Sequence, residues 1–126
     1  MSLEKEFIPY EQALALKEIG FDVPTLTAFD DEDGILVSSY SENVFSPINY
    51  NTSGYKTSRP EQWQVVEWLR VNHGIWVYVV GGGNNRYYPM YQDKNQYKLA
   101  LDLDKCYDTP QEAYSAAFDY ILNNLI

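Results

Sequence analysis

The chain is poor in the side chains that carry most catalytic and metal chemistry, with one histidine, His73, and one cysteine, Cys106, in 126 residues. A single cysteine cannot form an intrachain disulfide, and one histidine with one cysteine leaves too few soft ligands for a zinc site. No apolar run approaches the roughly 20 residues that span a bilayer. We therefore expect a protein of the reducing cytoplasm that has no cofactor, no metal ion and no contact with a membrane.

Basic residues are also scarce, since nine lysines and arginines stand against 18 acidic residues. A protein that binds duplex nucleic acid needs a basic footprint, so the net charge of −9 argues against that class. The charge is uneven, because residues 1–34 carry −7, residues 35–100 carry +2 and residues 101–126 carry −4. The middle segment could accept a small anion, whereas the acidic ends could mimic nucleic acid.

Aromatic residues, in contrast, are abundant: the chain has three tryptophans, five phenylalanines and twelve tyrosines. Tyrosine and tryptophan offer a large, rigid contact area with one polar group, and both are enriched at protein interfaces. The composition therefore favours recognition over catalysis, and we do not expect an enzyme. His73 lies on the apolar face of a predicted helix without an obvious catalytic partner in the sequence, so we expect it to be structural.

Three segments predict helices, each with a start or stop signal in the sequence. Residues 9–19 begin with a proline and are followed by Gly20, which suits a left-handed helix cap. The motif Ser58-Arg59-Pro60-Glu61 has the pattern of a capping box and predicts a helix over about residues 59–72. Thr109-Pro110-Gln111-Glu112 repeats this pattern and predicts a C-terminal helix.

Most of the remaining segments predict short strands, and the short connections between them favour antiparallel pairing. We expect a single α+β domain over residues 1–126, in which one antiparallel sheet of about five strands carries three helices mainly on one face. The expected order is α-β-β-(β)-α-β-β-β-α, and residues 1–6 are expected to form a flexible tail. The predicted strands are residues 26–29, 35–40, a short one near 44–50, 75–80, 87–92 and 97–103.

Two turn segments have compositions that ligand sites also use. Gly81-Gly82-Gly83-Asn84-Asn85 is rich in glycine, but a strand follows it where a phosphate loop needs a helix N-terminus. We interpret it as a hairpin tip, with an anion-binding loop that uses Arg86 as the alternative. The acidic residues 30–34 lack the length and the closing glutamate of a calcium loop, so we interpret them as a turn, with adventitious cation binding as the alternative.

The aromatic residues of the segment 75–97 carry the main functional prediction. Alternation along residues 75–80 places three aliphatic side chains on one face, which suits helix packing, and Trp76, Tyr78 and Val80 on the other. If no helix covers this second face, it forms an aromatic platform with a basic fringe; the alternative is that the aromatics thicken the core. The candidate residues for the ligand or partner face are Trp76, Tyr78, Tyr87, Tyr88, Tyr91, Arg86 and Lys98.

Two segments resemble a known group of proteins. Residues 7–22 read FIPYEQALALKEIGFD and residues 107–113 read YDTPQEA. Together they resemble small acidic proteins encoded by phages and prophage-like elements of gut Bacteroidales, which share a PYEQALALKELGFDEP-like start, a central aromatic helix and a closing TYEEAE or TPQEAY helix. Here the sequence VVEWLR at residues 65–70 stands where the central helix would lie. The resemblance implies a mobile-element protein and carries over no functional residue.

These observations leave three classes of function open. We expect first a non-enzymatic binding module of the host bacterial cytoplasm that engages a protein partner, or a second copy of itself, through the aromatic face. The alternative is a small-molecule binder that stacks a nucleotide base on the aromatics and meets its phosphate with Arg59, Arg86 or Lys98. A third possibility is an acidic inhibitor that mimics nucleic acid.

Overall fold

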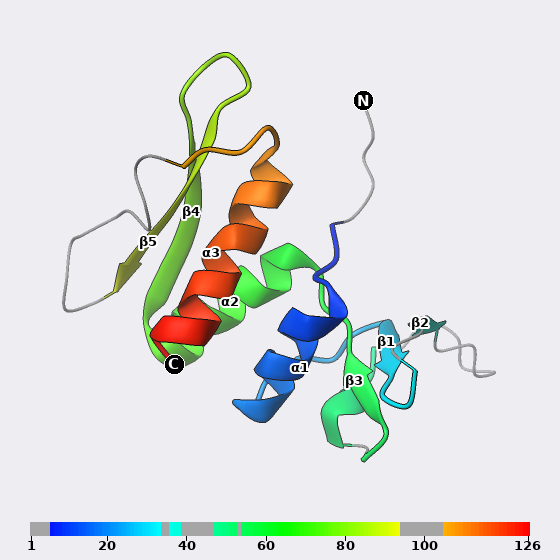
Figure 1. The fold of residues 1–126 in the computed structure, drawn as a ribbon. Coiled ribbons are helices and arrows are strands. Elements are labelled where there is room, and N and C mark those ends of the chain that lie inside the picture. Colours follow the sequence, from blue (N-terminus) through cyan, green and yellow to red (C-terminus); the bar gives the residue numbers. More distant parts are fainter. Residues whose placement is uncertain (1–5, 34–35, 39–46, 53, 94–104) are drawn as a thin grey trace. The chain divides into compact units, whose positions relative to one another are not determined.

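Helices and antiparallel strands alternate along the chain in the computed structural model, which confirms the α+β class (Figure 1). The structure describes residues 6–33, 36–38, 47–52, 54–93 and 105–126. The chain divides into two compact units, Met1–Glu61 and Gln62–Ile126, and each has its own strands and core. The expectation of a single domain stays a prediction.

Helix α1, Tyr10–Glu18, opens the N-terminal unit and ends as the sequence predicts. Gly20 adopts a left-handed conformation with φ of 94°, which a residue with a Cβ would adopt only with strain. Its N–H donates to the Lys17 carbonyl at 3.1 Å, and the N–H of Phe21 donates to the Leu16 carbonyl at 3.0 Å. These two bonds form a Schellman motif that satisfies terminal carbonyls and turns the buried Phe21 towards the core.

The predicted hairpin of this unit is confirmed. Strand β1, Thr27–Asp30, pairs antiparallel with β2, Leu36–Ser38, and also with β3, Lys56–Ser58. The three strands form one sheet in the order β2-β1-β3. The strand predicted near residues 44–50 lies partly outside the described residues, and its described part is a short bridge between Ile48 and Thr25, followed by the 3₁₀ helix η1, Tyr50–Thr52.

The capping box predicted at Ser58 is wrong, because strand pairing overrides this local signal. Ser58 belongs to β3, where it pairs with Ala28, and its hydroxyl accepts a hydrogen bond from the N–H of Tyr50 at 3.0 Å. Helix α2, Gln62–His73, begins four residues later than Ser58. In the segment between them, the Pro60 carbonyl accepts a hydrogen bond from the N–H of Ile8 at 3.2 Å.

The C-terminal unit consists of α2, a β-hairpin and a last helix. Strand β4, Ile75–Gly81, pairs antiparallel with β5, Tyr87–Asp93, and the glycine-rich segment forms the tip between them, as predicted. Gly83, Asn84 and Asn85 all have positive φ there, which is the conformation that tight turns demand. Helix α3, Pro110–Asn124, is capped at its N-terminus by Thr109, whose hydroxyl accepts from the Glu112 N–H at 3.2 Å, which confirms the predicted helix start and the N-cap part of the second capping box.

The single five-stranded sheet is not seen, because the described strands form one sheet in each unit. In the N-terminal unit β1 already has a strand on either side, so these strands complete a sheet among themselves, and α1 contacts β3. In the other unit α2 and α3 both contact β4, and α3 also contacts β5. The strand predicted at residues 97–103 lies outside the described residues.

Candidate interaction surface

One face of the β4–β5 hairpin is covered and the other is open. Ile75 and Val77 are each 5% exposed, whereas Trp76 is 57% and Val80 is 43% exposed. This alternation follows from the two-residue period of a strand, in which neighbouring side chains point to opposite faces. The predicted faces are confirmed by the burial of Ile75 and Val77 and the exposure of Trp76 and Val80, whereas Tyr78 and Val79 are both half-buried.

Cross-strand register extends the open face onto β5. In an antiparallel pair, residues directly opposite each other point to the same face. Trp76 lies opposite Gln92, Tyr78 opposite Met90 and Val80 opposite Tyr88. We call this surface the open face; its residues are the exposed Trp76 and Val80 and the half-buried Tyr78, Tyr88, Met90 and Gln92.

Tyr91 does not belong to the open face, contrary to its placement in the predicted site. It lies opposite the buried Val77, so its ring points to the covered side of the hairpin. There it stacks on Tyr120 of α3, with 5.7 Å between the ring centroids. Burial, the neighbouring Tyr120 phenol and the charge of Asp93 all raise the pKa of Tyr91. Its role is to pack α3 on the sheet.

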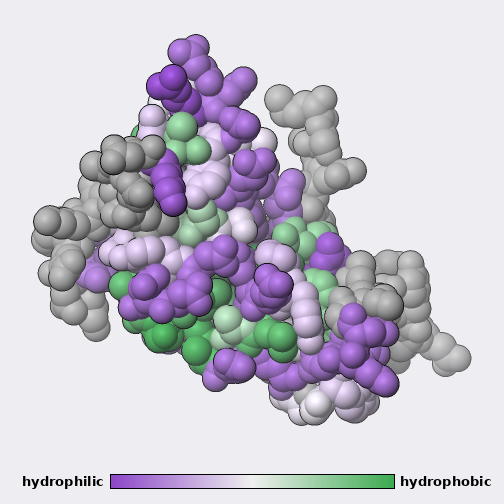
Figure 2. All heavy atoms as spheres, viewed as in Figure 1, coloured by the Kyte–Doolittle hydropathy of each residue, from purple (hydrophilic) through white to green (hydrophobic). Residues whose placement is uncertain are grey.

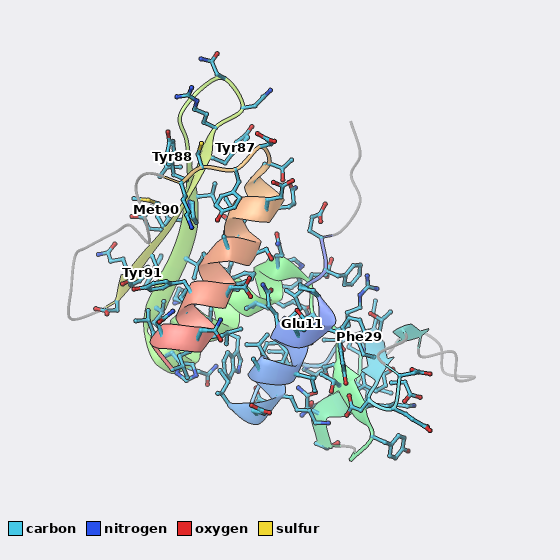
Figure 3. All side chains as sticks on the ribbon, viewed as in Figure 1. Glu11, Phe29, Tyr87, Tyr88, Met90 and Tyr91 are labelled. Atoms are coloured by element: carbon cyan, nitrogen blue, oxygen red, sulfur yellow. The ribbon has the colours of Figure 1, made fainter. Side chains whose placement is uncertain are left out.

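Tyr87 also lies on the covered side, because it is opposite Gly81 and one residue out of phase with Tyr88 (Figure 3). Its backbone N–H and carbonyl exchange two hydrogen bonds with Tyr107, each of 2.9 Å. These bonds extend the hairpin edge towards the start of α3. Of the four tyrosines predicted for the site, the structure therefore brings Tyr78 and Tyr88 together and separates Tyr87 and Tyr91 from them.

Tyr88 is held against the backbone of the hairpin tip. A Cβ built on Gly82 would lie only 2.7 Å from the Tyr88 ring, so glycine at this position allows the ring to lie flat on the strand. Met90 completes the face between Tyr88 and Gln92 and was missed from the sequence. Its place could have been found by applying the two-residue period to residues 86–92, once the register with β4 was known.

The basic fringe of the open face differs from the prediction. Arg86 is exposed at the hairpin tip, where Figure 2 shows a group of hydrophilic residues. Lys98 lies outside the described residues. A cation beside Trp76 is Arg70 of α2, whose guanidinium lies 5.5 Å from the indole centroid. This contact could not be predicted from the sequence, because it depends on the turn at Gly74 between α2 and β4.

Arg70 is held in place by Glu67, one turn earlier on α2. The two side chains form a hydrogen-bonded ion pair. This contact raises the pKa of Arg70 and lowers the pKa of Glu67. Both side chains are exposed, so the pair adds little to stability. Its effect is to orient a guanidinium beside the indole, where cations interact favourably with the ring.

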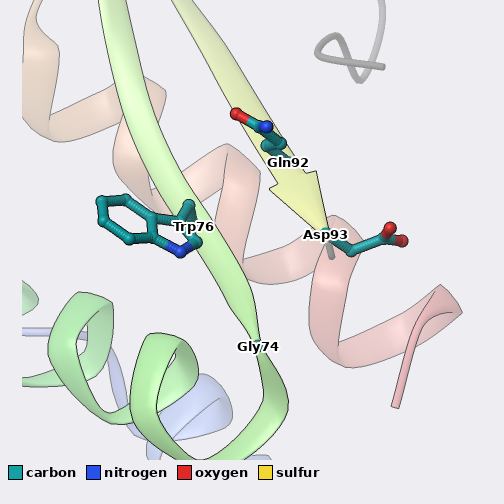
Figure 4. Close-up of a pocket in the computed structure, with 4 residues that line it drawn as sticks. All are labelled: Gly74, Trp76, Gln92 and Asp93. Carbon is teal, nitrogen blue, oxygen red and sulfur yellow. The ribbon is translucent and has the colours of Figure 1, made fainter. Parts of the chain in front are cut away.

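A hollow of about 390 Å³ adjoins the tryptophan end of the open face. Gly74, Trp76, Gln92 and Asp93 line it, and Figure 4 shows these residues grouped around the start of β4 and the end of β5. The lining offers an aromatic ring, an amide and a carboxylate. This set suits a ligand with an apolar ring and hydrogen-bond donors better than it suits a phosphate.

The acidic turn of the N-terminal unit has a structural role. The Asp31 carboxylate accepts hydrogen bonds from the Lys17 ammonium at 3.0 Å, the Thr57 hydroxyl at 2.5 Å and the Tyr10 hydroxyl at 3.3 Å. Burial raises the pKa of Asp31, but the hydrogen bonds from Thr57 and Lys17 and the Lys17 charge outweigh it, so the pKa is lowered. The carboxylate thereby connects α1 to β3.

The other residues singled out in the sequence also have ordinary structural surroundings. Arg59 belongs to the N-terminal unit, where its guanidinium lies 3.8 Å from the Phe7 ring centroid and burial lowers its pKa. His73 packs on the ring of Trp68 at 4.9 Å. Cys106 is exposed and unpaired by any disulfide. Within the described ranges, no group of three or more His, Cys, Asp and Glu side chains is placed to hold a metal ion.

Comparisons with known proteins add no assignment: no family model, no curated protein and no solved structure matches the chain. In the part of the chain that the structure describes, no helix is long and apolar enough to cross a membrane. The open face, with its exposed tryptophan and adjoining hollow, is therefore the feature from which a function can be argued.

Proposed function

We propose that this chain is a non-enzymatic binding module that engages a protein partner through the open face. The exposure of Trp76 on a regular, well-paired strand carries this proposal. A sheet face that meets water is normally polar, since alternation lets a strand place polar residues there at no cost to the core. Here four of the six open-face positions are aromatic or aliphatic residues that would bury apolar area in a complex, and Met90 is a fifth.

The residue types of the open face are those that dominate protein interfaces. Tryptophan and tyrosine are enriched among the few residues that carry most of the binding energy, and methionine is enriched in interface cores. The side chains of tryptophan and tyrosine have only two rotatable bonds each, so these two residue types lose little entropy on binding. Arg70 restricts Trp76 further by lying beside its ring. A partially fixed tryptophan at a surface is suited to act as an anchor in a partner's pocket.

The resemblance to phage and prophage-like proteins suggests the setting. A small accessory protein that acts in the cytoplasm of a bacterial host would meet its partner there, and such a protein needs a contact surface rather than a catalytic centre. The acidic N-terminal segment and the near-neutral middle segment are compatible with this role. The partner class that we propose is a protein, with self-association included.

A double substitution tests this proposal. Trp76→Ala with Tyr78→Ala removes the anchor residues, and Trp63→Ala with Val71→Ala is the matched control, because these α2 residues are each 64% exposed. We expect the first variant to remain folded by circular dichroism and to lose the proteins that co-purify with the wild-type chain, or its self-association. The control should retain them. Unchanged association of a folded Trp76/Tyr78 variant would refute the proposal.

A second candidate function rests on the hollow beside Trp76. Its volume of about 390 Å³ falls within the range of roughly 300–1,000 Å³ for small-molecule sites. We propose a planar ligand stacked on Trp76, with a hydrogen bond to the Gln92 amide, which lies opposite Trp76 on the same face. Arg86 precedes Gln92 by six residues, which is about 20 Å along a strand, so it would not reach a phosphate attached to this ligand.

Thermal-shift measurements separate this candidate from the first. Nucleosides and free bases should raise the melting temperature, because stacking on Trp76 needs only the planar ring of the base. Gln92→Ala should weaken the shift without reducing protein association through Tyr78 and Val80. Absence of a shift across a broad panel of bases would remove the small-molecule reading.

A further inference from the structure

The outer edge of β4 is a second unsatisfied surface of the hairpin. The Gly82 N–H donates to the Arg86 carbonyl at 2.8 Å, and this bond sets the phase of the ladder. Every second residue before Gly82 then bonds to β5, namely Trp76, Tyr78 and Val80. The backbone groups of Val77 and Val79 point away from β5, and among the described residues no strand other than β5 pairs with β4.

Two independent observations support this phase. Pro89 has no N–H to donate, and it lies opposite Val79, at a position where the phase requires no bond between the strands. Tyr87, two residues earlier on β5, exchanges its hydrogen bonds with Tyr107 and not with β4. The backbone groups of Tyr87 and Pro89 therefore point away from β4, just as the backbone groups of Val77 and Val79 point away from β5.

The two edges of the hairpin differ in how they are protected. The edge of β5 is interrupted by Pro89 and engaged by Tyr107. Strand β4 has the sequence IWVYVVG, with no charge and no proline over seven residues. Natural proteins protect exposed edge strands with charges, prolines or bulges, because an unprotected edge pairs with another strand. Strand β4 has none of these devices, so its edge is suited to pairing.

We infer that a second copy of this chain adds its own β4 to this edge, which rests on the proposed role of the hairpin as a binding surface. Antiparallel pairing about a two-fold axis at Tyr78 matches all seven residues of the strand with their counterparts. It places Val77 opposite Val79 of the second copy, so the outward backbone groups of both strands are satisfied. An uncharged strand can pair with itself in this way without bringing like charges together.

The same register joins the two open faces. Tyr78 lies beside Tyr78 of the second copy, and Trp76 lies beside Val80 of the second copy. The exposed Trp76 and Val80 side chains thereby cover one another across the axis. A sheet of four strands results from the two hairpins, with one continuous aromatic face. The occupant of the β4 edge is therefore a second molecule of this protein, bound by strand addition.

Amide hydrogen exchange tests this inference on the unmodified protein. The Tyr78 and Val80 amides bond to β5 within one molecule, so their protection should not depend on protein concentration. The Val77 and Val79 amides should become protected only as the concentration rises and the second copy binds. Sedimentation equilibrium on the same samples should show a monomer–dimer equilibrium. A wild-type chain that stays monomeric, or a dimer without concentration-dependent protection at Val77 and Val79, would overturn the inference.

A substitution at the axis gives a second test. Tyr78→Lys places two like charges directly opposite each other in the dimer, with their Cβ atoms about 5 Å apart, and together with the lost ring contact this should weaken dimerisation about tenfold or more. Tyr78→Phe is the control and should dimerise like the wild type. Equal dimerisation of the Lys and Phe variants would also overturn the inference. Both results leave the proposed function to its own test, since the Trp76/Tyr78 double variant still shows whether other proteins bind.

Discussion

Two valines of β4 allow burial on its two faces to be compared by the same substitution, valine to alanine. Val77 is 5% exposed on the covered side, and Val80 is 43% exposed on the open face. Replacing either with alanine removes the same two methyl groups and makes the same small change in β propensity. The difference between the two free energies of unfolding therefore reports burial and little else.

The magnitudes follow from the exposed fractions. Removing two buried methyl groups costs about 0.8 kcal/mol each, and the cavity left in a packed site raises the cost of Val77→Ala to about 2–3 kcal/mol. Val80 has little more than half of its surface covered and leaves no closed cavity, so Val80→Ala should cost about 0.5–1 kcal/mol. The expected difference between the variants is about 1.5–2 kcal/mol, which exceeds the usual error of denaturant measurements.

Urea unfolding at low micromolar protein concentration supplies the comparison, since dilution disfavours any complex that covers Val80. The midpoint should fall much further for Val77→Ala than for Val80→Ala, with similar slopes for both. Equal destabilisation by the two substitutions would show that Val80 is covered within the single chain. The open face would then be part of a core, and the aromatics would have the structural role considered for them in the sequence.

Three further predictions concern contacts within each of the two units. The pKa of Asp31 is lower in the folded state, so its contribution to stability is present above the unfolded pKa and is lost as pH falls through the folded pKa. The difference in free energy of unfolding between wild type and Asp31→Asn should therefore shrink on acidification. A constant difference would contradict the network with Lys17. Gly20→Ala should cost about 1–2 kcal/mol because of its positive φ, which chemical unfolding will show. Thr109→Ala should cost about 1 kcal/mol through loss of the cap on the Glu112 N–H; an unchanged midpoint would refute that cap.

The sequence predicted those features that depend on neighbouring residues. The Gly20 cap, the Thr109 cap and the alternation along residues 75–80 are all local, because φ, capping bonds and side-chain direction are set within a few residues. The prediction at Ser58 failed although its motif was good, since pairing with Ala28 supplies a competing and longer-range stabilisation. Local signals therefore predicted helix ends correctly only where no strand partner competed for the same residues.

The composition of the candidate site was harder to predict because it depends on register. Moving a strand by one residue moves each of its side chains to the other face, so the set that joins Trp76, Tyr87 with Tyr91 or Tyr88 with Met90, could not be chosen before the length of the hairpin turn was known. Arg70 could not be linked to Trp76 for a related reason, since their contact is made by the turn between α2 and β4. Residue type identified the right segment, and pairing decided which residues act together.

Site-specific photo-cross-linking tests most directly whether the open face is the contact surface. A photoreactive phenylalanine analogue is placed at position 80 on the open face or at position 71 on α2, where Val71 is 64% exposed and serves as the control. After irradiation in a bacterial lysate, covalent products with a partner or with a second copy should form from position 80 and not from position 71. Products from position 71 alone, or equal products from both positions, would contradict the assignment of the open face as the binding surface.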